Sequence, residues 1–213
     1  MSLMKADLFA YVLGMMLGDG SKLGGELEGF ASMNIDLQLT QKHPSNERMG
    51  EFVCMCVNCL GFGMDRIADK APTGTTRFGR QPAAAFRWAS ARSPLFAWMF
   101  SAGLGLGWNQ STTVDAVHMD WIFRTPSSFR LRFVQAIADS DGTVKPSEVI
   151  ITNVPNADFV TQLLKSLGMS TAHTVYENHL ALRTMVNRRQ AATLPIFSEF
   201  VRGYRYEKLR KNI

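Results

Sequence analysis

Residues 11–20, YVLGMMLGDG, are the stretch that decides how this chain folds. The stretch is an apolar run that stops abruptly at Asp-Gly, and its apolar residues recur at i, i+3, i+4, i+7 and i+8 counted from Leu8. That spacing places them on one face of a helix. On an adjacent ridge, Ala10, Gly14 and Gly18 recur at every fourth position. Small residues at this interval let a second helix backbone approach closely.

The same signal occurs again at residues 133–142, FVQAIADSDG. This run also ends at Asp-Gly and carries Ala136 and Ser140 on the matching ridge. The two runs therefore predict a pair of helices that pack against each other. We expect each helix to end in a left-handed glycine, Gly20 in the first and Gly142 in the second.

The carboxylates of Asp19 and Asp141 fall in the last turn of the two expected helices. The helix dipole is negative there and repels an anion by ~0.3–1 kcal/mol. Two such carboxylates on helices in contact also repel each other. A divalent cation offsets both penalties, and the carbonyls of a last helical turn are further oxygen ligands of the kind that Mg²⁺ prefers.

The composition is that of an ordinary globular protein, with 46% hydrophobic and 19% charged residues. A net charge of +5 favours an anionic partner. The sequence shows no apolar run long enough to span a membrane and no secretion signal, so no membrane partner is expected. The three cysteines all lie within residues 54–59, which argues against a disulfide scaffold and favours an intracellular setting, cytoplasmic in a prokaryote or organellar in a eukaryote.

Each Asp-Gly run is followed by the same order of strand and helix patterns. After the first run we expect strands at 22–30 and 34–40, a helix at 45–61, strands at 62–70 and 84–90, and a helix at 93–103. The second half is expected to have a helix at 129–140, a strand at 148–153, a helix at 156–168, strands at 170–176 and 179–184, and a helix at 187–200. This order predicts an α+β fold of two pseudo-symmetric αββαββα halves, residues 1–105 and 127–213, joined by a linker at 106–126.

The two runs resemble the LAGLIDADG motif of the homing endonucleases, as VLGMMLGDG at 12–20 and VQAIADSDG at 134–142. Both copies keep the Asp-Gly ending, and Gly14 and Ala136 keep the small ridge position. The earlier Asp of the motif is Leu17 in the first copy and Asp139 in the second. The resemblance implies that the two motif helices pack at the interface between the halves and that two antiparallel sheets form a saddle over DNA.

The resemblance also implies a function, that of a monomeric, intron-encoded endonuclease that hydrolyses both strands of a long DNA site and leaves short 3′ overhangs. Because the halves differ in sequence, we expect a non-palindromic target. The implied cofactor is Mg²⁺, with Mn²⁺ able to substitute and Ca²⁺ binding without supporting cleavage. The alternatives are an RNA maturase that assists intron splicing, and a catalytically inactive DNA-binding protein on the same fold. Retention of both motif acids favours cleavage.

The family further implies roles for individual residues. Carboxylates at the motif ends bind divalent ions, a polar residue at a strand-to-helix junction positions the attacking water, and a nearby Lys or Arg polarises water or phosphate. The positions that match are Asp19, Asp141, Gln41, Asn153, Lys42 and Lys145 as catalytic residues, and Gly18 and Ser140 as donors of metal-binding carbonyls.

DNA recognition is expected from the polar face of the strand at 34–40 and from basic residues on the outer strands and loops. Asn and Gln pair with adenine edges and Arg pairs with guanine, whereas contacts to phosphate position the protein without specifying sequence. The expected contacts are Asn34, Asp36, Gln38 and Thr40 on the strand, Arg66, Lys70, Arg77, Arg80 and Arg87 in the first half, and Arg183, Arg188 and Arg189 in the second.

Overall fold

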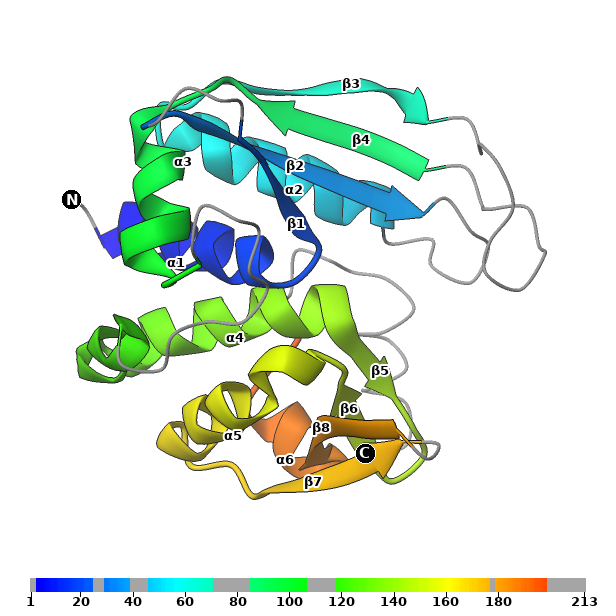
Figure 1. Cartoon of the computed structure of the whole chain (residues 1–213). Coiled ribbons are helices and arrows are strands. Elements are labelled where there is room, and N and C mark those ends of the chain that lie inside the picture. Colours follow the sequence, from blue (N-terminus) through cyan, green and yellow to red (C-terminus); the bar gives the residue numbers. More distant parts are fainter. Residues whose placement is uncertain are drawn as a thin grey trace.

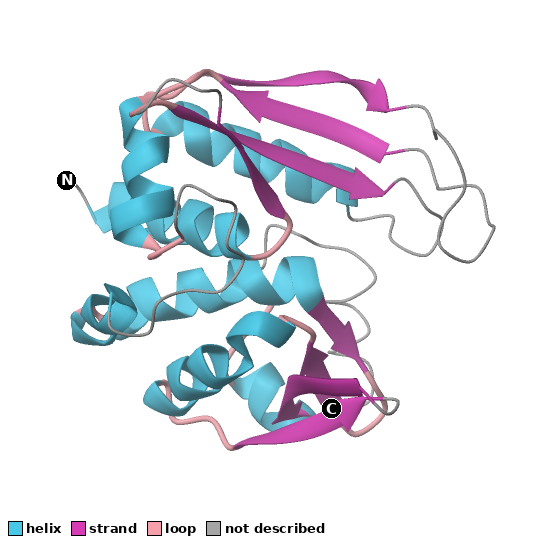
Figure 2. Cartoon of the chain, in the orientation of Figure 1, coloured by secondary structure: helices cyan, strands magenta, loops and turns pink. Residues whose placement is uncertain are grey.

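A computed structural model of the chain describes residues 3–24, 29–38, 46–70, 85–106, 118–176 and 179–198. Within them, two four-stranded antiparallel sheets are each backed by helices, and helices α1 (Leu3–Leu17) and α4 (Ser127–Asp141) run side by side between the two sheets (Figure 1). The strand orders are β1-β2-β4-β3 and β5-β6-β8-β7, the same path in both halves. The predicted α+β fold with two αββαββα halves is confirmed (Figure 2).

The first half follows the predicted order of elements closely. Its remaining elements are β1 (Gly20–Gly24), β2 (Ala31–Gln38), α2 (Asn46–Cys59), β3 (Met64–Lys70), β4 (Ala85–Ser90), α3 (Pro94–Trp98) and a π-helical turn η1 (Met99–Gly103). Ser93 caps α3 through its side chain, which accepts a hydrogen bond from the backbone N–H of Leu95, and Pro94 occupies the first helical position.

The second half repeats this path with shorter strands. It contains β5 (Gly142–Val144), β6 (Glu148–Ile151), η3 (Val154–Asn156), α5 (Ala157–Ser166), β7 (Thr171–Tyr176), β8 (His179–Asn187) and α6 (Arg188–Thr193). The sequence did not reveal β5, because a strand of three residues is too short to show alternation. Helix α6 is shorter than the helix expected at 187–200 and ends before Pro195. A 3-10 helix, η2 (His118–Arg124), occupies part of the expected linker, and the domain boundaries stay a prediction.

The close approach of α1 and α4 depends on the small residues of the ridge. A Cβ built on Gly14 would lie 2.9 Å from the Cβ of Ala136 and would collide with the carbonyl oxygen of Phe133. A Cβ on Gly18 would lie 2.9 Å from the Cβ of Ser140. The spacing of small residues in the two motif copies therefore does what the sequence predicted, and it brings the two backbones into direct contact.

The prediction that Gly20 and Gly142 adopt a left-handed conformation is wrong. Gly142 is extended, with φ −83° and ψ 142°, and Gly20 is not among the described glycines with positive φ. Helix α4 continues directly into β5, and only Gly18 and Asp19 separate α1 from β1, so neither chain segment makes a left-handed reversal at the glycine. The glycines are required by space instead: a Cβ on Gly142 would lie 2.8 Å from the Phe197 ring, and a Cβ on Gly20 would lie 2.6 Å from the Met16 Cα.

A buried polar contact joins the two motif helices to the C-terminal segment. The hydroxyl of Tyr11 donates to Asp139 Oδ2 at 2.7 Å, and the backbone N–H of Ser198 donates to Asp139 Oδ1 at 3.1 Å. Tyr11 is 1% exposed and Asp139 3% exposed. Burial and the neighbouring carboxylate of Asp139 raise the pKa of Tyr11 well above its ordinary value, so the phenol stays a hydrogen-bond donor.

Tyr11→Phe is expected to lower the free energy of unfolding by about 1.5–3 kcal/mol, because it leaves a buried carboxylate oxygen without this donor. Urea unfolding of Tyr11→Phe, Asp139→Asn and the double variant would measure the coupling between the two side chains. Additive effects of the two substitutions would contradict a direct hydrogen bond.

No helix in the described ranges is long and apolar enough to cross a membrane.

Candidate metal and nucleic-acid site

The two motif helices bring one carboxylate from each half to the same end of the interface. Both helices end on the side of the molecule where β1 and β5 begin, at the right of Figure 1. Asp141 is the last residue of α4, and Asp19 follows the end of α1; both are partly buried. A Cβ on Gly18 would lie 3.7 Å from Asp141 Oδ2, so the carboxylate of the second half lies against the last turn of the first helix.

The side chain of Asn153 fixes this carboxylate across the interface. Its amide nitrogen donates to Asp141 Oδ2 at 2.9 Å and to the carbonyl oxygen of Leu17 at 3.1 Å. Its amide oxygen accepts a hydrogen bond of 2.8 Å from the side chain of Asn156. Asn153 is 7% exposed, so both of its amide protons and its oxygen are engaged within the protein. The Asn153 side chain therefore orients the Asp141 carboxylate and links it by hydrogen bonds to the first half.

The atoms around these helix ends that could bind a metal ion are oxygen atoms. Among the residues that the structure describes, no group of three or more His, Cys, Asp or Glu side chains gathers. What the helix ends offer instead is one carboxylate from each half together with last-turn carbonyls such as those of Gly18 and Ser140. The Ser140 hydroxyl turns inward and donates to the carbonyl oxygen of Ile137 at 2.9 Å. Hard divalent cations such as Mg²⁺ prefer this all-oxygen ligand set, so the residues fit such an ion.

The first sheet has a polar face opposite its helices. Along β4, Phe86 and Trp88 are buried toward the helices, and Arg87 between them points to the other face. Arg87 pairs in register with Asp36 of β2, and its Nε and Nη2 donate to Asp36 Oδ1 and Oδ2, both at 2.6 Å. This hydrogen bonding raises the pKa of Arg87, so the guanidinium stays charged. Asn34 lies two residues earlier in β2 but is only 3% exposed.

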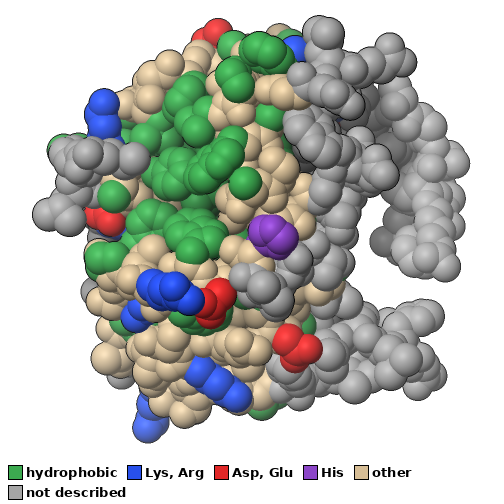
Figure 3. Space-filling view, turned by 60° about the vertical axis from the view of Figure 1, so that its left-hand side comes forward, with side chains coloured by type: hydrophobic (Ala, Val, Ile, Leu, Met, Phe, Trp, Pro, Cys, Tyr) green, Lys and Arg blue, Asp and Glu red, His purple; other side chains and the backbone are tan. Residues whose placement is uncertain are grey.

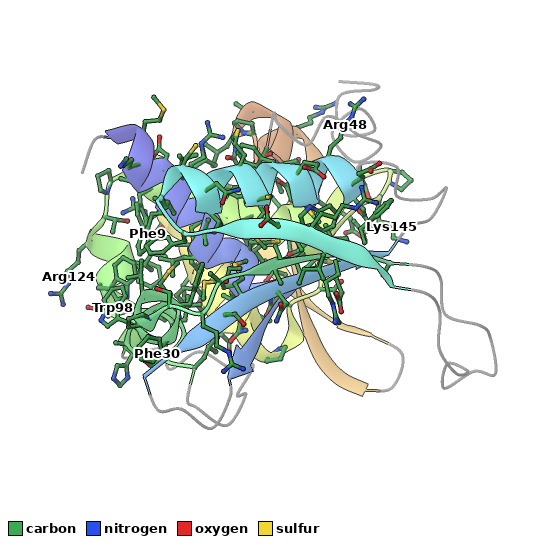
Figure 4. All side chains as sticks on the ribbon, turned by 90° about the horizontal axis from the view of Figure 1, so that it is seen from above. Phe9, Phe30, Arg48, Trp98, Arg124 and Lys145 are labelled. Atoms are coloured by element: carbon green, nitrogen blue, oxygen red, sulfur yellow. The ribbon has the colours of Figure 1, made fainter. Side chains whose placement is uncertain are left out.

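A second face of the molecule is apolar. Figure 3 turns the left-hand side of Figure 1 forward and shows hydrophobic side chains gathered there. Trp98 is 50% exposed and Phe30 is 46% exposed. Figure 4 labels both of them beside Phe9 and Arg124, on the side opposite Lys145. The apolar face therefore lies away from the ends of the motif helices.

Comparison with known proteins identifies the fold. No family model matches the sequence, and no curated protein is significantly similar to it. Among solved structures, mesophilic variants of the homing endonuclease I-DmoI match with a TM-score of 0.58 at 11% identity, over 92% of this chain and 98% of theirs. I-DmoI in complex with DNA and Mn matches with a TM-score of 0.56 at 12% identity, over 92% and 99%. The N-terminal LAGLIDADG domain of DUF199/WhiA matches with a TM-score of 0.52 at 9% identity, over 96% and 87%.

The chain has the LAGLIDADG fold. The resemblance inferred from the two Asp-Gly runs is thereby confirmed at the level of fold. Identities of 9–12% leave the roles of individual side chains to be argued from this chain itself.

The register of the strands shows which residue of the first half corresponds to Asn153. Gly20 pairs with Ile35 in the first sheet, and Gly142 pairs with Ile151 in the second. Asn153, two residues after Ile151, therefore corresponds to Leu37, which lies inside β2. Gln41 lies outside the described residues, so the expected match between Asn153 and Gln41 stays a prediction.

Arg66 lies on the helix side of the first sheet rather than on its polar face. It pairs in register with Trp88, its guanidinium lies 4.1 Å from the centre of the Phe86 ring, and its Nη1 bonds Glu47 Oε1 of α2 at 2.9 Å. A β-bulge between Arg66 and Ala68 reverses the faces of β3, which alternation in the sequence could not reveal. The expectation that Arg66 contacts DNA from the polar face is therefore wrong.

The structure describes only some of the other residues that the sequence predicted for catalysis or DNA binding. Lys145 follows β5 and is exposed, and Arg189 is exposed in α6, where its backbone N–H donates to the Asn187 side chain at 2.9 Å. For a further group the structure describes the backbone only: Gln38, Lys70, Arg183 and Arg188. Outside the described residues lie Thr40, Gln41, Lys42, Arg77 and Arg80.

Proposed function

We propose that this chain is a divalent-metal-dependent DNA endonuclease that cuts both strands of a long, asymmetric target. The observation that carries the proposal is the pair of close-packed motif helices, which bring Asp19 and Asp141 to the same end of the interface, one carboxylate from each half. Both carboxylates sit at the end of a helix where the dipole disfavours an anion.

The residues that would hold the metal are Asp19 and Asp141, with the carbonyls of Gly18 and Ser140. A bound divalent cation supplies a Lewis acid that stabilises charge on the phosphate and lowers the pKa of a water molecule. I-DmoI has been crystallised with DNA together with Mn and with Ca. We propose the same class of ion for this chain, with Mg²⁺ as the ordinary cofactor.

The chain's own residues perform the binding and positioning. Asn153 holds the Asp141 carboxylate against α1, so that its orientation does not depend on the ligand. The polar face of the first sheet presents Arg87 to double-stranded DNA. Since one chain carries both motif helices, it acts as a monomer, and each half serves one strand. The two halves differ in sequence, so the target is not a palindrome.

The test is incubation of the full chain with a randomised double-stranded DNA library and Mg²⁺, followed by sequencing of the cut ends. The proposal expects double-strand cuts at one asymmetric consensus. Binding to a consensus without cutting, in Mg²⁺ and in Mn²⁺, would contradict catalysis. It would support a second candidate, a protein on this fold that binds DNA without cutting it.

Asn153→Leu is expected to slow cleavage by about 10- to 100-fold, because it removes the hydrogen bond that orients a metal-binding carboxylate. Binding of the target with Ca²⁺ should change little, and nicked DNA should accumulate, because the bond acts on one carboxylate only. Gln162→Leu, an exposed amide on α5 in the same half, is the matched control. Equal cleavage rates for the two variants would show that Asn153 does not position the reacting groups.

A further inference from the structure

The guanidinium of Arg87 is held along one edge and leaves its other edge available. Its Nε–H and one Nη2–H are taken by the two carboxylate oxygens of Asp36, both at 2.6 Å. The remaining donors, on Nη1 and on the far side of Nη2, form the end of the guanidinium fork. Among the described residues no hydrogen-bond acceptor meets this end of the fork. The side chains of Arg87 and Asp36 are 33% and 36% exposed, so the pair lies at the surface of the sheet.

The described neighbours of Arg87 on its own strand are small. Its neighbours on the same face of β4 are Ala85 and Ala89, which have the smallest side chains apart from glycine. Asp36 faces Arg87 directly across the strand pair. A carboxylate with both oxygens bonded to a guanidinium acts here as a support for it. The support fixes the plane and direction of a side chain that otherwise has many rotamers.

We propose that Arg87, oriented by Asp36, reads one guanine in the major groove of the target DNA. Guanine presents N7 and O6 side by side there, and the two free N–H groups at the end of the fork match this pair of acceptors. The inference rests on the proposed DNA-binding function and adds the residue, the base and the supporting side chain. Arg87 specifies the sequence, and Asp36 is a positioning residue.

The position of the second half that corresponds to Arg87 is also an arginine, but the residue opposite it is not an aspartate. Ile35 pairs with Trp88, and Ile151 pairs with Thr184, so Arg87 corresponds to Arg183, and Asp36 corresponds to Thr152. Threonine has no charge with which to hold a guanidinium. The requirement for guanine is therefore expected to be stronger on the first half of the target than at the equivalent position of the second.

The experiment selects bound duplexes from a randomised double-stranded DNA library with Ca²⁺ in place of Mg²⁺, so that binding is read without cleavage. The full chain is compared with Arg87→Gln, Asp36→Asn and Arg183→Gln. Arg124→Gln is the control for loss of one positive charge, because Arg124 also pairs with an aspartate, Asp120 at 2.7 Å, but lies on the apolar side (Figure 4). Thermal unfolding of each variant checks that the sheet is intact.

Arg87→Gln is expected to lose about tenfold or more of the preference for guanine at one base pair and to keep the rest of the consensus. Asp36→Asn should weaken the same preference for guanine without creating a preference for another base. Arg183→Gln should change the base preference at a different position of the target, and Arg124→Gln should change the preference at no position. A uniform loss of affinity in Arg87→Gln, with a smaller salt dependence and an unchanged consensus, would assign Arg87 to phosphate and overturn the inference. If the unaltered chain selects no consensus, the proposed function itself fails.

Discussion

Asp19→Asn and Asp141→Asn are each expected to reduce double-strand cleavage by about 10²–10³-fold. A metal-binding carboxylate contributes several kcal/mol to the stabilisation of charge at the reacting phosphate, and each 1.4 kcal/mol is about a factor of ten in rate. Because each half supplies one of the two acids, the residual product of a single variant should be nicked duplex rather than cut duplex. The measurement is the rate of each strand break on the selected target at saturating protein.

Stability separates a catalytic role of Asp19 from a structural one. Asn has nearly the same size as Asp and keeps a hydrogen-bonding oxygen, and the lost charge is one that the helix dipole disfavours by ~0.3–1 kcal/mol. Asp19→Asn should therefore change the free energy of unfolding by no more than about 1 kcal/mol while activity falls. Asp7→Asn, which removes a carboxylate from the same helix near its other end, is the control and should keep full activity. Parallel loss of stability and cleavage in Asp19→Asn would mean that the carboxylate supports the fold and not the reaction.

Gly14→Val is expected to destabilise the protein by about 3 kcal/mol or more, and Gly14→Ala by about 1–3 kcal/mol. The added carbon would lie 2.9 Å from the Ala136 Cβ and would strike the backbone of Phe133, which cannot move aside without separating the two helices. Separation of α1 from α4 would expose the interface on which both carboxylates depend. Urea unfolding monitored by circular dichroism gives the change in free energy.

Gly63→Ala is the matched control for the substitutions at Gly14. Nothing lies within 4 Å of a Cβ built there, and Gly63 is absent from the described glycines with positive φ. This substitution should be neutral or slightly stabilising, by up to about 1 kcal/mol, because it restricts the unfolded chain. Equal unfolding midpoints for Gly14→Ala and Gly63→Ala would refute close packing of the two motif helices.

Local patterns in the sequence determined the order of elements and the pairing of the motif helices. These patterns are helical periodicity, strand alternation and small residues at every fourth position. Each of them is complete within one helix or one strand, so it can be read from a short segment of sequence. The repeat of Asp-Gly at residues 19–20 and 141–142 also predicted that the chain consists of two pseudo-symmetric halves. The sequence alone therefore predicted that the carboxylates at the two motif ends lie at the same end of the helix pair.

The tertiary structure alone decided which side chains meet across long separations. Asn153 bonds the carbonyl of Leu17, and Asp139 bonds Tyr11, because the two halves fold against each other. A bulge in β3 turned Arg66 toward the helices, whereas Arg87 stayed on the polar face beside Asp36. Register, bulges and the abutting of two backbones are set by packing across the whole fold, and no pattern within one segment carries that information.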